Sequence, residues 1–215
     1  MYQDRTEAGS QLAEILTNHN YGQIIILAIP RGGIVVAAPI AQRLEVPINV
    51  LITKKIGHPA HAEIAIGAVM PDGSAIIDAE AQNIFDEEYI SQATIKAYQE
   101  IKRRLSVYQA TETLPQLAGK TAIIIDDGIA TGHTVKAAIK WLRTLKPAKV
   151  ILAIPVAPPD IIAELSSQVE EIICPTQPKQ LRAVGFYYHD FSPISEADAL
   201  SILAEINQHN AIGQK

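Results

Sequence analysis

Residues 121–134 contain the pattern that most constrains the fold of this chain. The apolar run Thr121–Ile125 is followed at once by Asp126 and Asp127, and then by a loop of small and hydroxyl residues that leads into a helical pattern. A β-branched run of this length, bounded by turn signals, is typical of a strand that is buried on both faces. Ligands of open α/β sheets bind beyond the carboxyl ends of such strands. We therefore predict a strand, an acidic edge, an anion-binding loop and a helix start, in that order.

The same strand–turn–helix pattern recurs along the chain and predicts the fold class. An apolar run at 23–29 enters the turn 30–33 and then a helical pattern to about residue 44. Further strands are expected at 50–53, 149–155 and 170–174, and helices at 6–18, 86–108, 132–145, 158–167 and 195–208. This alternation predicts an α/β fold with a mainly parallel central sheet flanked by helices. The apolar runs 64–70 and 74–78 flank Pro71-Asp72-Gly73 and predict a small hairpin subdomain.

The loop after Ile125 carries groups that suit two kinds of ligand chemistry. Carboxylates at positions 126 and 127 can accept hydrogen bonds from hydroxyls or organise a hydrated cation. Gly128 and Gly132 permit close backbone approach. The helix start at about Gly132 provides unpaired N–H groups and the positive end of a dipole, which suit a phosphate. A polyol and a phosphate therefore both fit, and a ribose 5-phosphate has both.

This stretch resembles the phosphoribosyl diphosphate (PRPP) binding motif of type I phosphoribosyltransferases. The resemblance implies that Asp126 and Asp127 hold the ribose hydroxyls, and that the following loop wraps the 5-phosphate. That loop consists of Gly128, Ile129, Ala130, Thr131, Gly132, His133 and Thr134. The alternative is an acidic turn that caps an ordinary helix. The resemblance covers Arg31 to Asp190, and the whole chain resembles a group of predicted bacterial phosphoribosyltransferases whose substrate is unassigned. It implies a single domain over residues 1–215, with a PRPP-binding core at about 20–175, and a hood and C-terminal helix at about 176–210.

Two further segments gain a role from this resemblance. Arg31-Gly32-Gly33 is similar to the first pyrophosphate-binding loop of the family, although a plain tight turn would also explain it. The resemblance implies a non-proline cis peptide bond near Arg31. Lys54 and Lys55 end the strand expected at 50–53 and precede a Gly/Pro-containing loop, which suits a mobile lid over pyrophosphate, with Lys55 as the first choice for the contact. Two solvated lysines at a turn are the alternative.

The base-binding side is expected near the C-terminus. Phe186 and Tyr187 could stack on a heteroaromatic base, and Asp190 could pair with a base edge or reach a metal ion, although core packing explains the aromatic residues equally well. Oxopurine-specific family members commonly have an aspartate where this chain has Ala130, whereas adenine and uracil types often have alanine there. The sequence therefore leaves the base open.

The resemblance implies a PRPP-dependent transferase that joins a nitrogenous base to ribose 5-phosphate, giving a nucleoside monophosphate and pyrophosphate. Catalysis would use Asp126, Asp127, Arg31 and Lys55. Mg²⁺ would be held mainly through PRPP, with Asp126, Asp127 and Asp190 as further candidate ligands. A non-catalytic PRPP sensor and a phosphosugar enzyme that reuses the same loop are the alternatives. The expected partners are PRPP and a small heterocyclic base, in a homodimer.

Other features of the sequence exclude several classes of function. The net charge of −5 gives no electrostatic reason to expect nucleic-acid binding. The single cysteine excludes an internal disulfide framework and a cysteine-based zinc site. The N-terminus shows no secretory pattern and the apolar runs are too short to span a bilayer, so we expect a cytoplasmic protein without a membrane segment.

Two polar pairs have simple explanations. Asp4 and Arg5 precede the helix at 6–18, where helix-start electrostatics accounts for them more simply than pairing with another segment. His58 and His61 are three residues apart, but Pro59 lies between them and no cysteine is near, which argues against a metal site.

Overall fold

The computed structural model describes residues 1–110 and 114–213, without the side chains of 62–64 and 211–213. The chain divides into two compact units, and each is described by itself. The first unit comprises Met1–Leu51, Pro115–Thr131 and Lys146–Lys215, and the second comprises Ile52–Leu114 and Gly132–Leu145.

The first unit contains the parallel sheet that the sequence predicts. Its five strands lie in the order β2-β1-β6-β7-β8, and all neighbouring pairs are parallel. The strands are β1 (Ile24–Ala28), β2 (Ile48–Val50), β6 (Thr121–Ile125), β7 (Lys149–Ala153) and β8 (Glu171–Ile173). From β1 the chain proceeds outward to β2, and from β6 it proceeds outward in the opposite direction. The boundary between β1 and β6 is therefore the point at which strand order reverses, where open α/β sheets bind their ligands.

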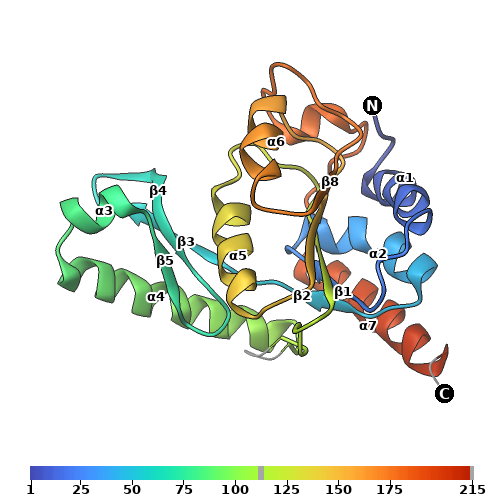
Figure 1. Ribbon diagram of the computed structural model, residues 1–215, viewed down its shortest axis with the longest axis horizontal. Helices are drawn as coiled ribbons and strands as arrows, with labels where there is room; N and C mark the ends of the chain where they lie inside the picture. The colour runs from blue at the N-terminus through green and yellow to red at the C-terminus, as the bar shows by residue number, and fades with distance from the viewer. Residues whose placement is uncertain (111–113, 214–215) are drawn as a thin grey trace. The chain divides into compact units, whose positions relative to one another are not determined.

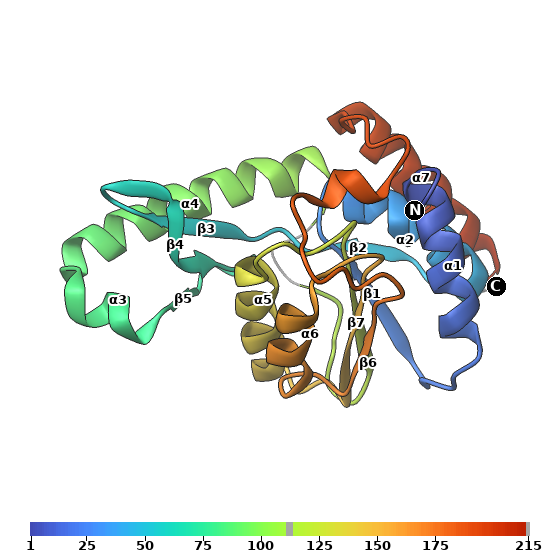
Figure 2. The same cartoon turned by 90° about the horizontal axis from the view of Figure 1, so that it is seen from above.

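Helices cover both faces of this sheet. The helices of the first unit are α1 (Arg5–Thr17), α2 (Gly32–Leu44), α6 (Pro159–Ser166) and α7 (Glu196–Gly213), with a short 3₁₀ helix η1 (Val184–Tyr187). Helix α2 packs on β1, β2 and β6, and α1 and α7 pack on α2. In Figures 1 and 2, α1 and α2 lie on one side of the sheet and α6 lies on the other. Asp4 caps α1 by accepting a hydrogen bond from the Glu7 N–H, as its helix-start position predicts.

The second unit is built on a three-stranded antiparallel sheet, in the order β3-β4-β5. Its elements are β3 (Lys54–His58), β4 (His61–Val69), β5 (Ala75–Ile77), α3 (Ala79–Ile84), α4 (Glu87–Val107) and α5 (His133–Thr144). The hairpin predicted around Pro71-Asp72-Gly73 is confirmed, as is the long helix that follows it. The Trp141 Nε1–H donates to Asp72 Oδ2 at 2.8 Å and fixes the hairpin turn against α5.

Two sequence predictions for residues 50–58 are wrong. The strand expected at 50–53 lies at Ile48–Val50 instead. Lys54 and Lys55 do not end a strand before a loop; they begin β3, which pairs antiparallel with β4. Burial of Ile56, which is 2% exposed, and backbone pairing with β4 outweigh the weak strand propensity of lysine and glycine, because strand propensity depends strongly on context.

Among the helices that the structure describes, none is both long and apolar enough to cross a membrane.

Candidate active site at the carboxyl ends of β1 and β6

The acidic pair and the glycine turn meet where strand order reverses. Ala28 and Ile125 are register partners in β1 and β6, and the Ile29 N–H extends the pairing by donating to the Ile125 carbonyl at 2.9 Å. The two segments that leave these strand ends, 30–33 and 126–127, therefore start side by side. The structure thus brings together the residues predicted to bind ribose and those of the glycine turn predicted to bind pyrophosphate.

The glycine turn packs directly against the acidic pair. A Cβ atom on Gly33 would lie 2.6 Å from the Ile125 carbonyl oxygen, and one on Gly32 would overlap the Asp127 carboxylate. Neither position has room for a side chain without a shift of its neighbours. The Pro30–Arg31 peptide bond is cis, which confirms the expectation that the resemblance gave for this turn.

Protein groups fix both carboxylates. Asp126 Oδ1 accepts a hydrogen bond from the Asp127 N–H at 2.8 Å. Asp127 Oδ2 accepts one from Arg5 Nε at 2.7 Å, in an ion pair whose side chains are only 18% and 9% exposed. Each carboxyl group thus has one oxygen engaged by a protein donor.

Arg5 is a residue that the sequence did not place beside the acidic pair. Its position before a helix made local electrostatics a simpler explanation than pairing with another segment, and nothing in the sequence identifies a partner 122 residues away. An arginine is rarely buried unless it is paired, so burial of Arg5 would indicate a partner. That burial becomes visible only in the fold.

The segment 184–192 closes over the acidic pair from the C-terminal side. The Tyr188 hydroxyl donates to the Asp127 carbonyl at 2.6 Å, and Tyr188 is 5% exposed. Burial raises the pKa of this hydroxyl, so it remains a donor at neutral pH. Arg5 also donates to the Ser192 carbonyl at 3.0 Å. The aromatic character of this segment is visible in the sequence, but the contact of Tyr188 with the acidic pair is not.

The residues predicted to bind the base lie in this segment but differ in surroundings. Phe186 is 64% exposed, whereas Tyr187 is half-buried and packs on the apolar cluster around Tyr2 and Tyr188. Asp190 is exposed, and its Oδ1 accepts hydrogen bonds from the Ser192 N–H and hydroxyl, which lower its pKa. Phe186 therefore retains an available ring face, and Asp190 is an ionised surface carboxylate.

The loop predicted to bind phosphate begins in the first unit and continues into the second. Ile129 is 3% exposed and its N–H donates to the Val156 carbonyl at 2.9 Å, whereas Ala130 and Thr131 are exposed. Gly132, with a φ of 72°, is the N-cap of α5 and offers no side chain to the first turn. The loop therefore has one anchored residue and an exposed tip that leads to a helix N-terminus, which suits an anion.

The two lysines predicted to bind pyrophosphate belong to the second unit. Lys54 and Lys55 are consecutive residues of β3, so their side chains point to opposite faces of the hairpin. Only one of them can therefore face a given ligand.

The residues present fit a magnesium ion that a ligand brings with it. Among the side chains that the structure describes, there is no group of three or more His, Cys, Asp or Glu placed to hold a metal ion. Mg²⁺ commonly takes one or two carboxylates and completes its octahedron with phosphate oxygens and water. Asp126 and Asp127 could supply that share.

The ionisation of Asp126 gives a first test of this geometry. Burial, and then the charge of Asp127, raise the pKa of Asp126 well above its usual range. The folded protein therefore binds a proton more tightly there than the unfolded chain, so stability should fall as pH rises from about 4 through the folded pKa. Asp126→Asn removes this ionisation while keeping an acceptor for the Asp127 N–H.

We therefore expect Asp126→Asn to melt at a higher temperature than the wild type at pH 7–8, with the difference shrinking towards pH 4. Thermal unfolding of both proteins across this pH range measures the effect. A difference in melting temperature that stays constant at every pH would contradict a raised pKa at Asp126.

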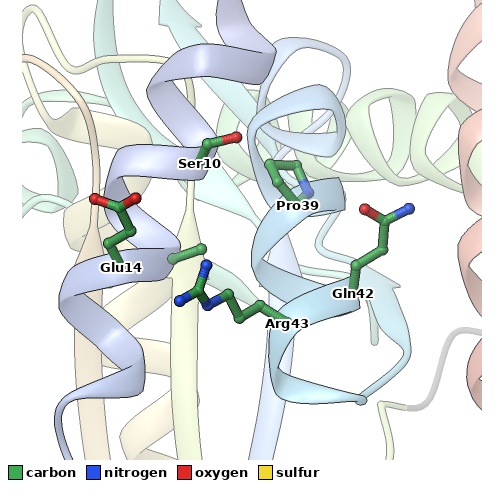
Figure 3. Close-up of a pocket in the computed structure, with 6 residues that line it drawn as sticks. Ser10, Glu14, Pro39, Gln42 and Arg43 are labelled. Carbon is green, nitrogen blue, oxygen red and sulfur yellow. The ribbon is translucent and has the colours of Figure 1, made fainter.

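A separate cavity lies between α1 and α2, away from the acidic pair. It has a volume of about 330 Å³ and is lined by Ser10, Ala13, Glu14, Pro39, Gln42 and Arg43 (Figure 3). Pro39 lies seven residues into α2 from Gly32, roughly 10 Å along the helix axis. Arg43 extends from α2 towards α1. The cavity lacks the paired carboxylates and the glycine turn. The carboxyl ends of β1 and β6 therefore remain the better candidate for the active site.

Comparison with known proteins gives a consistent result. A family model described as the phosphoribosyl transferase domain matches residues 4–190. The chain is 34% identical over 205 residues to Rv0571c of Mycobacterium tuberculosis H37Rv, which is provisionally named a phosphoribosyl transferase. That alignment covers 94% of this chain and 46% of the relative, so the chain spans about half the length of the curated relatives it matches.

Solved structures share the fold. TT1426 from Thermus thermophilus superposes with a TM-score of 0.84 at 31% identity, covering 95% of this chain and 98% of that one. AQ2163 from Aquifex aeolicus shares the fold with a TM-score of 0.53 at 16% identity, covering 84% and 76%.

Proposed function

The chain belongs to the phosphoribosyltransferase family, and on this premise we propose that it transfers the phosphoribosyl group of PRPP to a nitrogenous base. The products would be a nucleoside monophosphate and pyrophosphate. The observation that carries the proposal is the meeting of Asp126-Asp127 with the turn Arg31-Gly32-Gly33 at the boundary between β1 and β6. A ligand with a diol and a pyrophosphate on adjacent carbons needs the acidic pair and the glycine turn to lie side by side.

Each part of PRPP has a protein counterpart in this proposal. The ribose hydroxyls donate to carboxyl oxygens of Asp126 and Asp127, and the 5-phosphate lies in loop 128–134. The pyrophosphate lies beside Arg31, Gly32 and Gly33, with Lys55 as the first candidate and Lys54 as the second candidate for a further contact. Phe186 stacks on the base, with Tyr187 and Asp190 nearby.

The reaction is a displacement at C1 of the ribose. The bond from C1 to pyrophosphate breaks as the bond to a base nitrogen forms, and positive charge develops on the ribose, as in other glycosyl transfers. Magnesium, when bound with PRPP, offsets the negative charge of the pyrophosphate. Arg31 donates hydrogen bonds to the departing pyrophosphate, and the acidic pair holds the ribose so that C1 faces the base. Catalysis thus comes mainly from positioning and electrostatics.

A screen for pyrophosphate release tests this proposal. We expect release from Mg²⁺-PRPP with at least one member of a panel of purines, pyrimidines and related heterocycles, and none without a base. Arg31→Ala should lower kcat/KM by about 100-fold or more, because loss of one well-placed donor to a developing charge costs about 3 kcal/mol. PRPP binding without pyrophosphate release across the whole panel would instead favour a PRPP sensor. Absence of PRPP binding would contradict both the transferase and the sensor.

A further inference from the structure

Arg5 is the point at which three separately predicted parts of the site meet. Its Nε donates to Asp127 Oδ2 at 2.7 Å, and its Nη1 donates to the Ser192 carbonyl at 3.0 Å. Its guanidinium carbon lies 3.7 Å from the centroid of the Phe191 ring. A Cβ atom on Gly32 would approach Arg5 Nε to 2.9 Å. One guanidinium therefore contacts the ribose-side carboxylate and the base-side segment, and it leaves no room for a side chain at Gly32 of the pyrophosphate turn.

The geometry of these contacts constrains Asp127 more than a single ion pair would. The guanidinium is a rigid plane, held at one edge by the Ser192 carbonyl and on one face by the Phe191 ring. A donor fixed in this way also fixes the carboxylate that accepts from it. The Tyr188 hydroxyl holds the Asp127 backbone from the same segment. With Oδ2 occupied, Oδ1 is the oxygen that Asp127 can offer to a ligand.

We propose that Arg5 is a positioning residue for PRPP: by holding Oδ2 of Asp127 it sets the plane of that carboxylate and directs Oδ1 towards a ribose hydroxyl. This inference rests on the proposed function and extends it to a residue outside the binding motif. A merely structural ion pair would stabilise the fold and leave the affinity of the folded protein unchanged. A positioning residue changes that affinity even when the protein is fully folded.

Calorimetry with Mg²⁺-PRPP separates the two roles. The titrations compare the wild type with Arg5→Met and Arg5→Lys, at a temperature where circular dichroism shows each protein to be folded. We expect Arg5→Met to weaken binding by about tenfold or more. Arg5→Lys keeps the charge but cannot donate to Asp127 and Ser192 from one plane, so it should also bind more weakly than the wild type. Millimolar methylguanidinium should restore part of the affinity to Arg5→Ala but none to Asp127→Asn.

Arg43→Met is the matched control, because Arg43 lies in the last turn of α2, beside the α1–α2 cavity (Figure 3). Its affinity should equal that of the wild type. Wild-type affinity in folded Arg5→Met and Arg5→Lys would overturn the inference and leave the proposed function standing. If Arg5→Met does not fold, the affinity of folded Arg5→Lys decides in its place. Failure of the wild type to bind PRPP would overturn the proposed function, and the inference with it.

Discussion

Replacing Asp126 and Asp127 together with asparagine is expected to weaken Mg²⁺-PRPP binding by about 100-fold or more. A hydrogen bond to a charged group contributes about 1.5–3 kcal/mol, and the ribose hydroxyl that donates to Asp127 loses such a bond in this variant, while the contact with Asp126 is altered as well. Asparagine keeps an acceptor oxygen, so the loss is partial, but about 3 kcal/mol in total already corresponds to more than 100-fold. The loss of negative charge near any magnesium that PRPP carries acts in the same direction.

Isothermal titration calorimetry of the wild type and the double variant measures this effect. Glu87→Gln with Glu88→Gln is the matched control, because it also neutralises two adjacent carboxylates, which lie exposed at the start of α4. The control should bind as the wild type does. Equal affinity of the Asp126/Asp127 variant and the wild type would exclude the acidic pair from the ligand site.

Much of the fold could be predicted because the signals are local. The central strands β1, β6 and β7 each contain a short apolar run bounded by turn residues, and the hairpin around Asp72 has the turn residues that such hairpins require. Strand β3 was missed because its residues, Lys54 to His58, carry no apolar alternation. Its conformation comes from pairing with β4 across a tight turn at Pro59 and Ala60, and tertiary pairing of this kind overrides local propensity.

The site could be predicted only in part, for a related physical reason. Asp126, Asp127 and the glycine turn are found from the sequence because their chemistry follows directly from where each strand ends. Arg5 and Tyr188 act on Asp127 from 122 and 61 residues away, and neither lies in a motif. Their roles depend on how α1 and segment 184–192 pack on the sheet, which no local pattern encodes.

Arg5→Met is expected to lower the free energy of unfolding by about 3–5 kcal/mol. Removing one partner of a buried ion pair leaves the other charge without compensation, and such changes typically cost this much. The side chains of Arg5 and Asp127 are 9% and 18% exposed, so solvent screens the pair only weakly. For a chain of this length the melting temperature should fall by roughly 10 °C. Urea unfolding followed by circular dichroism measures the loss.

A double-mutant cycle shows how much of this loss belongs to the pair itself. Arg5→Met combined with Asp127→Leu leaves no unpaired charge, so the double variant should be more stable than the sum of the single losses predicts, by about 1–3 kcal/mol. Arg104→Met is the control, since Arg104 Nε lies 3.0 Å from Glu100 in an ion pair that is 37% and 31% exposed. Exposed pairs contribute about 1 kcal/mol or less. If Arg5→Met and Arg104→Met lose equal stability, the Arg5–Asp127 pair is no more than a surface contact, and its placement between the glycine turn and Phe191 does not stabilise the site.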